Sequence, residues 1–432
     1  MKRYAEYKDS GIEWIGDIPK DWEVRKNRYL FCRVKNIVGD DELSYPVLSL
    51  SINGVIEKDR EDNSGKTPAV YANYYQIIKL GNLLLCLFDM DVTPCLVGYV
   101  EKTGIISPAY SYFEPFKKES VSPKYYFYWY LRMHKENLFI PLSNNVRNSI
   151  NNDDFKEIVA PYPPLNIQKV ISNFLDTKTI AIDTLINDKQ KLIELLKEKR
   201  QAIISEAVTK GLDKNIKMKD SGIEWIGVIP ENWEIKRIKF IAKKTLMYGA
   251  NESAEDDDPN FPRYIRITDI NEHGHLNPKT FKSLPPDKAS PYLLSEGDIL
   301  FARSGATVGK TYIHKGDEQA CFAGYLIKLS VDEKKALSEF VYYNTLTHRY
   351  VNWINLNTIQ ATIQNVSAEK YNNYEIAIPN ISEQKKIVAY LDSQTLKLDS
   401  VLCDIQEQIE KLKEYRQSII SEVVTGKVMI EC

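Results

Sequence analysis

The 432-residue sequence lacks the features that mark metalloproteins, disulfide-rich secreted proteins and membrane proteins. Its six cysteines are scattered, with no C-x-x-C pair and no metal-ligand spacing. Its longest apolar runs, such as GNLLLCLF at 81–88, are too short to span a bilayer. The N-terminus, MKRYAEYKDS, has no apolar segment behind its basic residues and does not read as a signal peptide. We therefore expect a cytoplasmic protein with reduced thiols.

The sequence also lacks an excess of either charge. The formal net charge is −2 and the pI is about 6.3, which argues against a protein that coats nucleic acid by charge alone. Local basic faces remain compatible with this balance, because a sum hides the distribution of charge. Hydrophobic residues make up 43% and charged residues 27%, so a globular chain with buried cores is predicted. The length favours two or three domains.

Cofactor motifs occur only as incomplete matches. The segment SGATVGKT at 304–311 has one residue too few between Gly305 and Gly309 for a phosphate-binding loop, and a Gly-rich turn between two strands is the better interpretation. The segment DPNF at 258–261 resembles the Asp-Pro-Pro-Phe element of amino-methyltransferases. Asn260 replaces a proline there, and no Gly-rich cofactor loop precedes it.

Catalytic and metal-binding patterns are equally weak. The D-x-K patterns at 154–156 and 332–334 match half of a nuclease site, but no partner carboxylate is placed by the sequence. His273 and His275 form an isolated pair in a polar loop, where solvation is the simpler interpretation. We assign no catalytic, cofactor-binding or metal-binding residue, and we do not expect a stand-alone enzyme.

The strongest positive feature is a duplicated phrase. KDSGIEWIGDIP begins at Lys8 and KDSGIEWIGVIP begins at Lys219, with eleven of twelve letters identical and an offset of 211 residues. Two later segments, 168–210 and 384–426, align without a gap at an offset of 216 residues. Self-similarity on this scale predicts two tandem halves, each with a variable body followed by a long helix.

The two later segments carry the pattern of long paired helices. Apolar residues of the second copy step by four and three along a heptad seam, at Leu398, Leu402, Ile405, Ile409 and Leu412. The first copy has the same register, interrupted by Lys189, at Ile182, Ile186, Ile193 and Leu196. Gly211 and Gly426 stand where C-caps belong. The seam predicts a coiled coil between the copies in either direction, with separate burial of each helix as the alternative.

The bodies, 24–160 and 235–376, have a different pattern. Each contains aromatic-rich helical stretches, at 123–131 and 339–346. Short β-rich runs bounded by turn signals lie at 45–50, 82–88, 264–267, 297–301 and 325–329. Each body is therefore predicted to be a mixed α/β domain. The openings and the long helices agree between the halves, whereas the bodies diverge. The halves therefore share a common frame of opening and helix and differ in the body that each frame carries.

These features resemble the specificity (S) subunit of type I restriction–modification systems over essentially the whole chain. The specific marks are the S-G-I-E-W-I-G-x-I-P-x-x-W openings at 10–22 and 221–233 and the glutamine that follows a proline at the start of each helix, Gln168 and Gln384. A further mark is EGDILFARSGATVGK at 296–310. The first body departs from this last pattern, with LGNLLLCLFDMDVTP at 80–94 and no SGA turn.

The resemblance implies a mixed α/β (α+β) fold with an internal pseudo-twofold repeat. Two tandem target recognition domains are expected at 1–160 and 218–378, with long helices pairing as a coiled coil at 161–217 and 379–432. Each domain would read one half of a bipartite site in double-stranded DNA. The helices would set the spacer and dock two modification (methyltransferase) subunits, and motor–nuclease restriction subunits would complete the complex. S-adenosylmethionine, ATP and Mg are expected in the partner subunits and no cofactor in this chain.

Base edges are read mainly by Arg, Lys, Asn and Gln, and phosphates by Lys, Arg, Ser and Thr. In the second body the candidates are Arg303, Ser304, Thr307 and Lys310 after a strand, and Gln360, Thr362 and Gln364 in a polar loop at 357–365. The first-body counterparts of that loop are Asn144, Asn145, Arg147 and Asn148. The alternative is that these side chains cap turns. Two other function classes stay open, a coiled-coil scaffold without DNA recognition and a free-standing adenine methyltransferase, which the altered DPNF segment disfavours.

Overall fold

The structure is a computed structural model, and it describes residues 2–39, 44–52, 54–59, 74–143, 148–271, 274–305, 307–358 and 365–431. Within these ranges, none of the helices combines the length and apolarity needed to cross a membrane. The chain divides into two compact units, the first formed by 1–189 with 406–432 and the second by 190–405. Each unit therefore contains one body and one end of both long helices.

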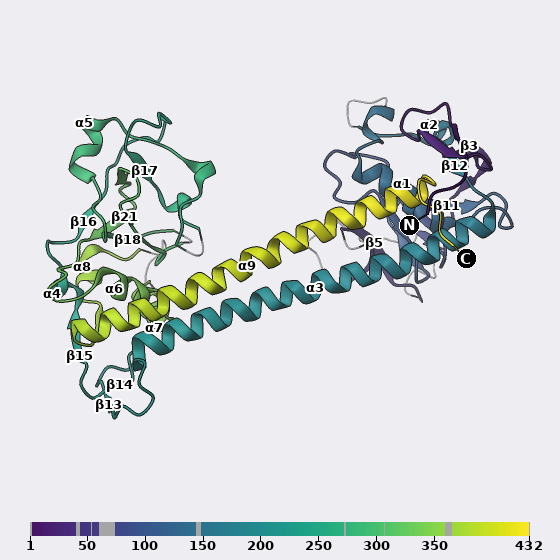
Figure 1. The fold of residues 1–432 in the computed structure, drawn as a ribbon. Helices are drawn as coiled ribbons and strands as arrows, with labels where there is room; N and C mark the ends of the chain where they lie inside the picture. Colours follow the sequence, from purple (N-terminus) through teal and green to yellow (C-terminus); the bar gives the residue numbers. More distant parts are fainter. Residues whose placement is uncertain are drawn as a thin grey trace. The chain divides into compact units, whose positions relative to one another are not determined.

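The first unit is built from small sheets around an aromatic helix (Figure 1). One four-stranded sheet has the order β6 (Gly54–Lys58), β5 (Val47–Ser51), β10 (Gly104–Ile106), β7 (Gln76–Ile78). A second has the order β4 (Phe31–Val34), β11 (Ser111–Pro115), β8 (Leu83–Leu85), β9 (Val97–Tyr99). The predicted aromatic helix is α1 (Pro123–Lys135), whose Tyr125, Tyr126 and Trp129 are fully buried. The opening forms a separate hairpin of β1 (Tyr7–Asp9) and β2 (Asp17–Pro19).

The second unit has a similar plan. Its four-stranded sheet has the order β16 (Met247–Tyr248), β21 (Leu326–Leu329), β18 (Ile299–Ala302), β19 (Thr311–Ile313). Beside it, β17 (Arg263–Ile265) pairs in parallel with β20 (Ala320–Phe322), and the second opening forms the hairpin of β13 (Met218–Asp220) and β14 (Val228–Pro230). The helices of the body are α4 (Ile238–Ile241), α5 (Pro286–Ala289), α6 (Ser338–Thr345), α7 (His348–Thr358) and α8 (Ala368–Asn372). The mixed α/β class predicted for both bodies is confirmed.

The two predicted long helices are confirmed. Helix α3 spans Leu165–Lys210 with 46 residues, and α9 spans Ile381–Val424 with 44 residues. Both end near a glycine with positive φ, +77° at Gly211 and +73° at Gly426. Glycine adopts this left-handed conformation without the steric cost that a Cβ imposes, so it ends a helix cleanly.

The helices run antiparallel within each unit. In the first unit Arg416 Nε lies 2.9 Å from Asp183 Oδ1, and Lys189 Nζ donates to Gln408 Oε1 at 2.6 Å, so contacts move back along α9 as they move forward along α3. The predicted seam is buried or half-buried in both helices, at Ile182, Ile186, Ile193, Leu196, Leu398, Leu402, Ile405, Ile409 and Leu412. The predicted pairing is confirmed, and these contacts show that it is antiparallel.

The second unit repeats this ion pair with the roles of the helices exchanged. Arg200 Nε on α3 lies 3.0 Å from Asp399 Oδ1 on α9. These two residues stand 216 positions from Arg416 and Asp183, respectively. The internal repeat seen in the sequence therefore extends to side-chain contacts.

Each long helix begins with a wholly buried glutamine. Gln168 Nε2 donates to the Pro163 carbonyl, and Gln168 Oε1 accepts from the Ser122 backbone N–H, each at 2.8 Å. Gln384 makes the same two bonds at the same distances in its own unit. Its partners are Pro379 and Leu337. The proline-to-glutamine spacing thus ties the start of each helix to the start of the body's aromatic helix.

The openings explain why the phrase occurs twice. Trp22 packs at the end of α9, where a Cβ on Gly426 would lie 3.0 Å from its ring, and Trp233 packs likewise at the end of α3, 3.5 Å from a Cβ on Gly211. Strand β3 (Glu23–Lys26) then pairs with β12 (Val159–Tyr162), and β15 (Glu234–Arg237) pairs with β22 (Glu375–Ile378). Each opening therefore covers the C-terminal end of one long helix and connects it to a body.

Candidate DNA-recognition site

The predicted readout turn of the second unit begins at Arg303 and ends at Lys310, and it connects β18 and β19. Ala302 N donates to the Lys310 carbonyl at 2.8 Å, and Gly309 N donates to the Ala302 carbonyl at 2.9 Å, which closes a hairpin. Gly305 and Gly309 have φ of +84° and +86°. The described residues of the SGATVGKT segment, 304–305 and 307–311, thus form a Gly-rich turn followed by a strand, as predicted, and this strand is not the helix N-terminus that a phosphate loop requires.

Arg303 is more firmly anchored than a loop-edge arginine. Its backbone N–H donates to the Tyr325 carbonyl at 3.0 Å, and its carbonyl accepts from Val366 N at 2.8 Å. The guanidinium carbon lies 4.7 Å from the centre of the Tyr248 ring, and Nε is buried without a hydrogen-bond partner in the described part of the chain. A cation over an aromatic face is stabilised electrostatically, so this side chain also supports the turn.

Ser304 brings the two predicted segments of the second body together. It forms an isolated antiparallel bridge with Asn365, the last residue of the predicted polar loop. The start of that loop was predicted wrongly, because Asn357 and Thr358 belong to α7. Both side chains bond back to the preceding helical turn, Asn357 Nδ2 to the Trp353 carbonyl at 2.8 Å and Thr358 Oγ1 to the Ile354 carbonyl at 3.0 Å. The candidates Gln360, Thr362 and Gln364 lie outside the described residues.

Thr307 and Lys310 lie in the second half of the turn. Thr307 is half-buried, and its carbonyl accepts from Lys310 N at 3.1 Å. Lys310 Nζ donates to the Ile270 carbonyl at 3.2 Å. Lys310 lines a hollow of about 340 Å³ together with Arg200 of α3, whereas Ser304 lines a different hollow. Ser304 and Lys310 therefore face different hollows.

The first unit contains the same turn, within residues 87–93, without the SGA sequence. Ile150 N donates to the Leu87 carbonyl at 2.8 Å, which reproduces the Val366 to Arg303 bond 216 residues earlier. Asp89 has a φ of +45° at the position that Gly305 occupies in the second unit. Asp is among the few non-glycine residues that tolerate the left-handed backbone region. In the sequence, only this Asp, four residues before Thr93, could have indicated a turn here. Phe88, Asp91 and Val92 are exposed on this turn, and sequence analysis did not select them.

Of the first-body candidates, only Asn148 is among the described residues. It has a φ of +44°, and its carbonyl accepts from Met90 N at 3.2 Å, so it lies beside the first-unit turn. Asn144, Asn145 and Arg147 lie outside the described residues. Both units thus place the end of the predicted polar loop against the turn that follows the central strand.

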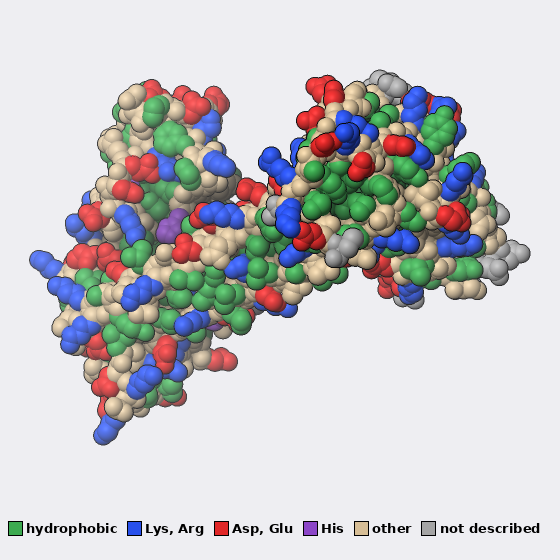
Figure 2. Space-filling model, turned by 45° about the vertical axis from the view of Figure 1, so that its right-hand side comes forward, with side chains coloured by type: hydrophobic (Ala, Val, Ile, Leu, Met, Phe, Trp, Pro, Cys, Tyr) green, Lys and Arg blue, Asp and Glu red, His purple; other side chains and the backbone are tan. Residues whose placement is uncertain are grey.

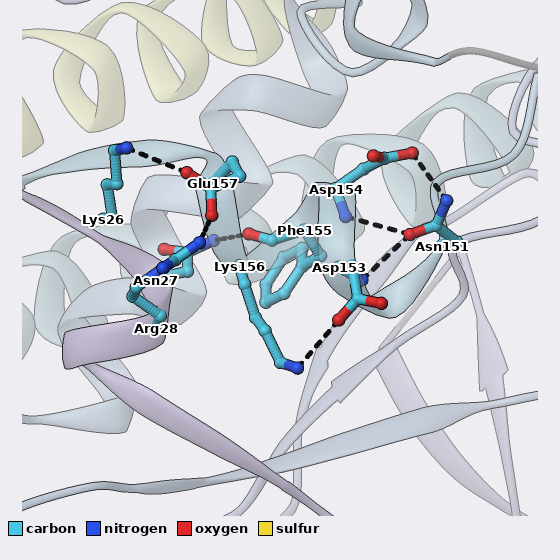
Figure 3. Close-up of polar contacts among 9 residues, drawn as sticks. All are labelled: Lys26, Asn27, Arg28, Asn151, Asp153, Asp154, Phe155, Lys156 and Glu157. Atoms are coloured by element: carbon cyan, nitrogen blue, oxygen red, sulfur yellow. Dashed lines mark hydrogen bonds and ion pairs between the residues drawn. The ribbon is translucent and has the colours of Figure 1, made fainter.

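The D-x-K pattern at 154–156 belongs to a capped helix (Figure 3). Asn151 Oδ1 accepts from the backbone N–H groups of Asp153 and Asp154 at 2.9 Å each, which caps α2 (Asn152–Glu157). Lys156 Nζ donates to Asp153 Oδ1 at 2.9 Å and thereby lowers the pKa of Asp153. The residues of this pattern therefore serve the local structure of the helix.

The same helix ties the opening to the body. Glu157 accepts from Lys26 Nζ at 2.8 Å and also pairs with Arg28, as Figure 3 shows. Asn27 Nδ2 donates to the Phe155 carbonyl at 3.0 Å. These bonds fix α2 to the segment that follows β3, so the exposed charges here are largely paired.

The other motif matches are also local turns. Asp332 Oδ1 accepts from Lys334 N at 3.2 Å, and Asp258 Oδ1 accepts from both Asn260 nitrogens at 2.9 Å. Across the described ranges, no group of three or more His, Cys, Asp and Glu side chains is placed to hold a metal ion. On the face in Figure 2, Lys and Arg side chains are interspersed with Asp and Glu, in keeping with the near-neutral net charge.

Comparisons with known proteins agree with this architecture. The family model for the type I restriction modification DNA specificity domain matches residues 96–195 and 230–411. The MjaVIII specificity subunit of Methanocaldococcus jannaschii is 23% identical over 427 residues, covering 96% of this chain and 94% of the relative. The EcoKI specificity subunit of Escherichia coli K12 is 22% identical over 293 residues, covering 65% of this chain and 60% of the relative.

Two solved structures share the fold. One, described as "Structural basis underlying complex assembly and conformational transition of the type I R-M system", has a TM-score of 0.70 at 14% identity and covers 95% of this chain and 99% of its own. The HsdS subunit from Thermoanaerobacter tengcongensis has a TM-score of 0.51 at 15% identity, with 95% and 98% covered. With its doubled frame and two matched specificity domains, the chain belongs to the family of type I restriction–modification specificity subunits.

Proposed function

We propose that each unit reads one half of a bipartite site in double-stranded DNA on behalf of a type I restriction–modification complex. The observation that carries this proposal is the contrast within the repeat. The frame contacts recur, as in the Gln168 and Gln384 bonds, while the turn differs between Phe88-Asp89 and Ser304-Gly305. Contacts to a shared assembly are the same for both halves, whereas contacts to two different base sequences differ.

In this proposal the chain supplies recognition and no catalysis. S-adenosylmethionine, ATP and Mg belong to the partner subunits, and this chain holds none of them. Support comes from the motif matches, because the D-x-K, DPNF and SGATVGKT segments all serve caps, turns or hairpins. The carboxylates of Asp154, Asp258 and Asp332 are thereby engaged in local structure.

The long helices are proposed to dock two modification subunits and to set the spacer between the half-sites, with motor–nuclease restriction subunits completing the complex. Exposed apolar side chains recur at equivalent positions of the helices. Ile180 is 65% exposed and Leu396 is 72% exposed, and Leu185 and Val401 are 45% and 43% exposed. Apolar side chains that recur on both helices offer two equivalent surfaces to two copies of one partner.

The docking surfaces are tested by single charge substitutions. Ile180→Glu or Leu396→Glu should remove one of two modification subunits from the purified complex, measured as the mass of the assembly. Leu356→Glu is the matched control, because Leu356 is 61% exposed on α7 and has no equivalent on the long helices. Assembly with two modification subunits in both helix variants would contradict this part of the proposal.

The function itself is tested by exchanging the second body, residues 235–376, for that of a relative. Mapping of methylated adenines in cells that carry the system should show a change in one half of the recognised site only. A change in both halves would overturn the assignment of one half to each unit. Duplex affinity that does not fall steeply with salt would instead favour a scaffold without DNA contact, since phosphate contacts release counterions.

A further inference from the structure

A polar-rimmed hollow lies beside the readout turn of the second unit. Its volume is about 620 Å³. It lies between the segment 250–254, the start of η4 (Ile267–Asp269), and residues 323–325, which precede β21. Ser304 lines it from the readout turn, so the hollow is continuous with the surface predicted to meet DNA. Asn251, Thr268 and Tyr325 also line it.

The charged side chains of this hollow are already paired. Arg266 Nη2 lies 2.7 Å from Asp269 Oδ1, and Asp269 is 1% exposed, so hydrogen bonding to Asp269 raises the pKa of Arg266. Glu252 accepts from Lys288 Nζ at 2.9 Å. These charges are compensated within the protein, which leaves little attraction for a phosphate group.

Among the neutral polar side chains, the Tyr264 hydroxyl donates to the Ala250 and Glu252 carbonyls at 2.8 and 3.1 Å, whereas three others are not engaged. In the described part of the chain, the side chains of Asn251, Thr268 and Ser304 make no hydrogen bond, and Tyr325 is 67% exposed. Free amide and hydroxyl groups around a hollow with alanine walls, Ala250, Ala254 and Ala323, suit the donors, acceptors and methyl groups of base edges.

The backbone holds Asn251 in a defined place. Ala250 N donates to the Phe322 carbonyl at 2.9 Å, and Gly324 N donates to the Ala250 carbonyl at 2.7 Å. A Cβ on Gly324 would collide with Asn251 Oδ1, so the amide lies directly over this glycine. Asn251 is therefore positioned at the rim before any ligand arrives.

We propose that Asn251 is a specificity-determining residue that contacts an adenine edge in one half of the target site, with Ser304 and Tyr325 completing the contact surface. This inference rests on the proposed function. A carboxamide matches adenine because it accepts from N6 and donates to N7 at once. Ala109 stands at the position in the first unit that corresponds to Tyr325, so the contact is specific to the second half-site.

Two variants test the inference in different ways. Asn251→Ala removes the amide, and Gly324→Ala keeps it but displaces it, because the flexible end of the Asn251 side chain yields to the new Cβ. Each should lower the affinity of the assembled complex for the wild-type site by about 5- to 160-fold and relax the requirement for one base in one half-site. Asn352→Ala, on an exposed residue of α7, should change neither property.

The measurements are duplex binding at fixed salt and mapping of methylated adenines, with the melting temperature as a check on folding. Unchanged affinity and unchanged methylation in both Asn251→Ala and Gly324→Ala would overturn the role of Asn251. Equal weakening for all duplex sequences would show a phosphate contact and would also overturn it. A wild-type complex without any bipartite base requirement would refute the proposed function itself, which is a separate outcome.

Discussion

Replacing Gln384 with Ala should destabilise the second unit specifically. Gln384 is fully buried, and its amide bridges the Pro379 carbonyl and the Leu337 N–H at 2.8 Å each. Removing one partner of a buried hydrogen bond costs about 1–3 kcal/mol for each group left unpaired. Two such groups, together with the space left by the side chain, predict a loss of about 2–6 kcal/mol in the free energy of unfolding.

The assay is thermal unfolding combined with hydrogen exchange read by mass spectrometry. In a unit of about 200 residues, each kcal/mol shifts the melting temperature by about 2–4 °C, so a drop of at least about 4 °C is expected. Faster exchange should be confined to amides of 190–405. Gln406→Ala is the control, because Gln406 is exposed on α9 and, among the described residues, its side chain bonds to Glu410 alone, at 3.2 Å.

The equivalent change in the first unit completes the test. Gln168→Ala removes bonds to Pro163 and Ser122 of the same length, so it should cause a similar loss with faster exchange confined to the first unit. A loss below about 1 kcal/mol in both variants would refute the view that these glutamines anchor the helices. Exchange that rises equally in both units would refute the independence of the two anchors.

Three further predictions concern the helices and the readout turn. Inserting seven residues into both long helices at opposing positions should preserve the seam and lengthen the recognised spacer by about 10 Å, or about three base pairs. Methylation mapping measures the spacer, and an unchanged spacer would show that the helices do not set its length. Replacing Arg200 with Asp should lower the free energy of unfolding by about 1 kcal/mol, and adding Asp399→Arg should restore it. A double variant that does not recover this stability would argue against the ion pair as a determinant of register. Gly305→Ala should cost about 1–2 kcal/mol because φ is +84°, whereas Gly98→Ala would test crowding without that strain; a thermal shift for Gly305→Ala within error would contradict the strained turn.

The repeat was predictable because two distant segments share most of their residues, and the long helices were predictable because their signals are local. A heptad seam and a terminal glycine are complete within one segment, and the observed helices end beside Gly211 and Gly426 as expected. The mixed class of the bodies was also predictable, because short β-rich runs and aromatic helices alternate there. For the helices and the class of the bodies, the physical information lies in neighbours along the chain.

Other features depended on contacts between distant segments. The seam alone predicts no direction, and cross-helix contacts such as Asp183 with Arg416 and Arg200 with Asp399 show that the helices are antiparallel. The first-unit turn escaped detection because Asp89 takes a backbone conformation that glycine usually takes. The D-x-K pattern became interpretable only when Asn151 was found capping its helix.

The candidate contacts to DNA show the same division. Arg303 and Ser304 were selected because their residue types and their place after a strand are visible in the sequence. Asn251 and Tyr325 were not, because they stand 74 positions apart and nothing local marks either one. The sequence by itself determined a doubled frame of two bodies and two long helices. Only the tertiary structure decided which side chains share a surface, because a binding surface is assembled from segments whose proximity is set by packing and hydrogen bonds far along the chain.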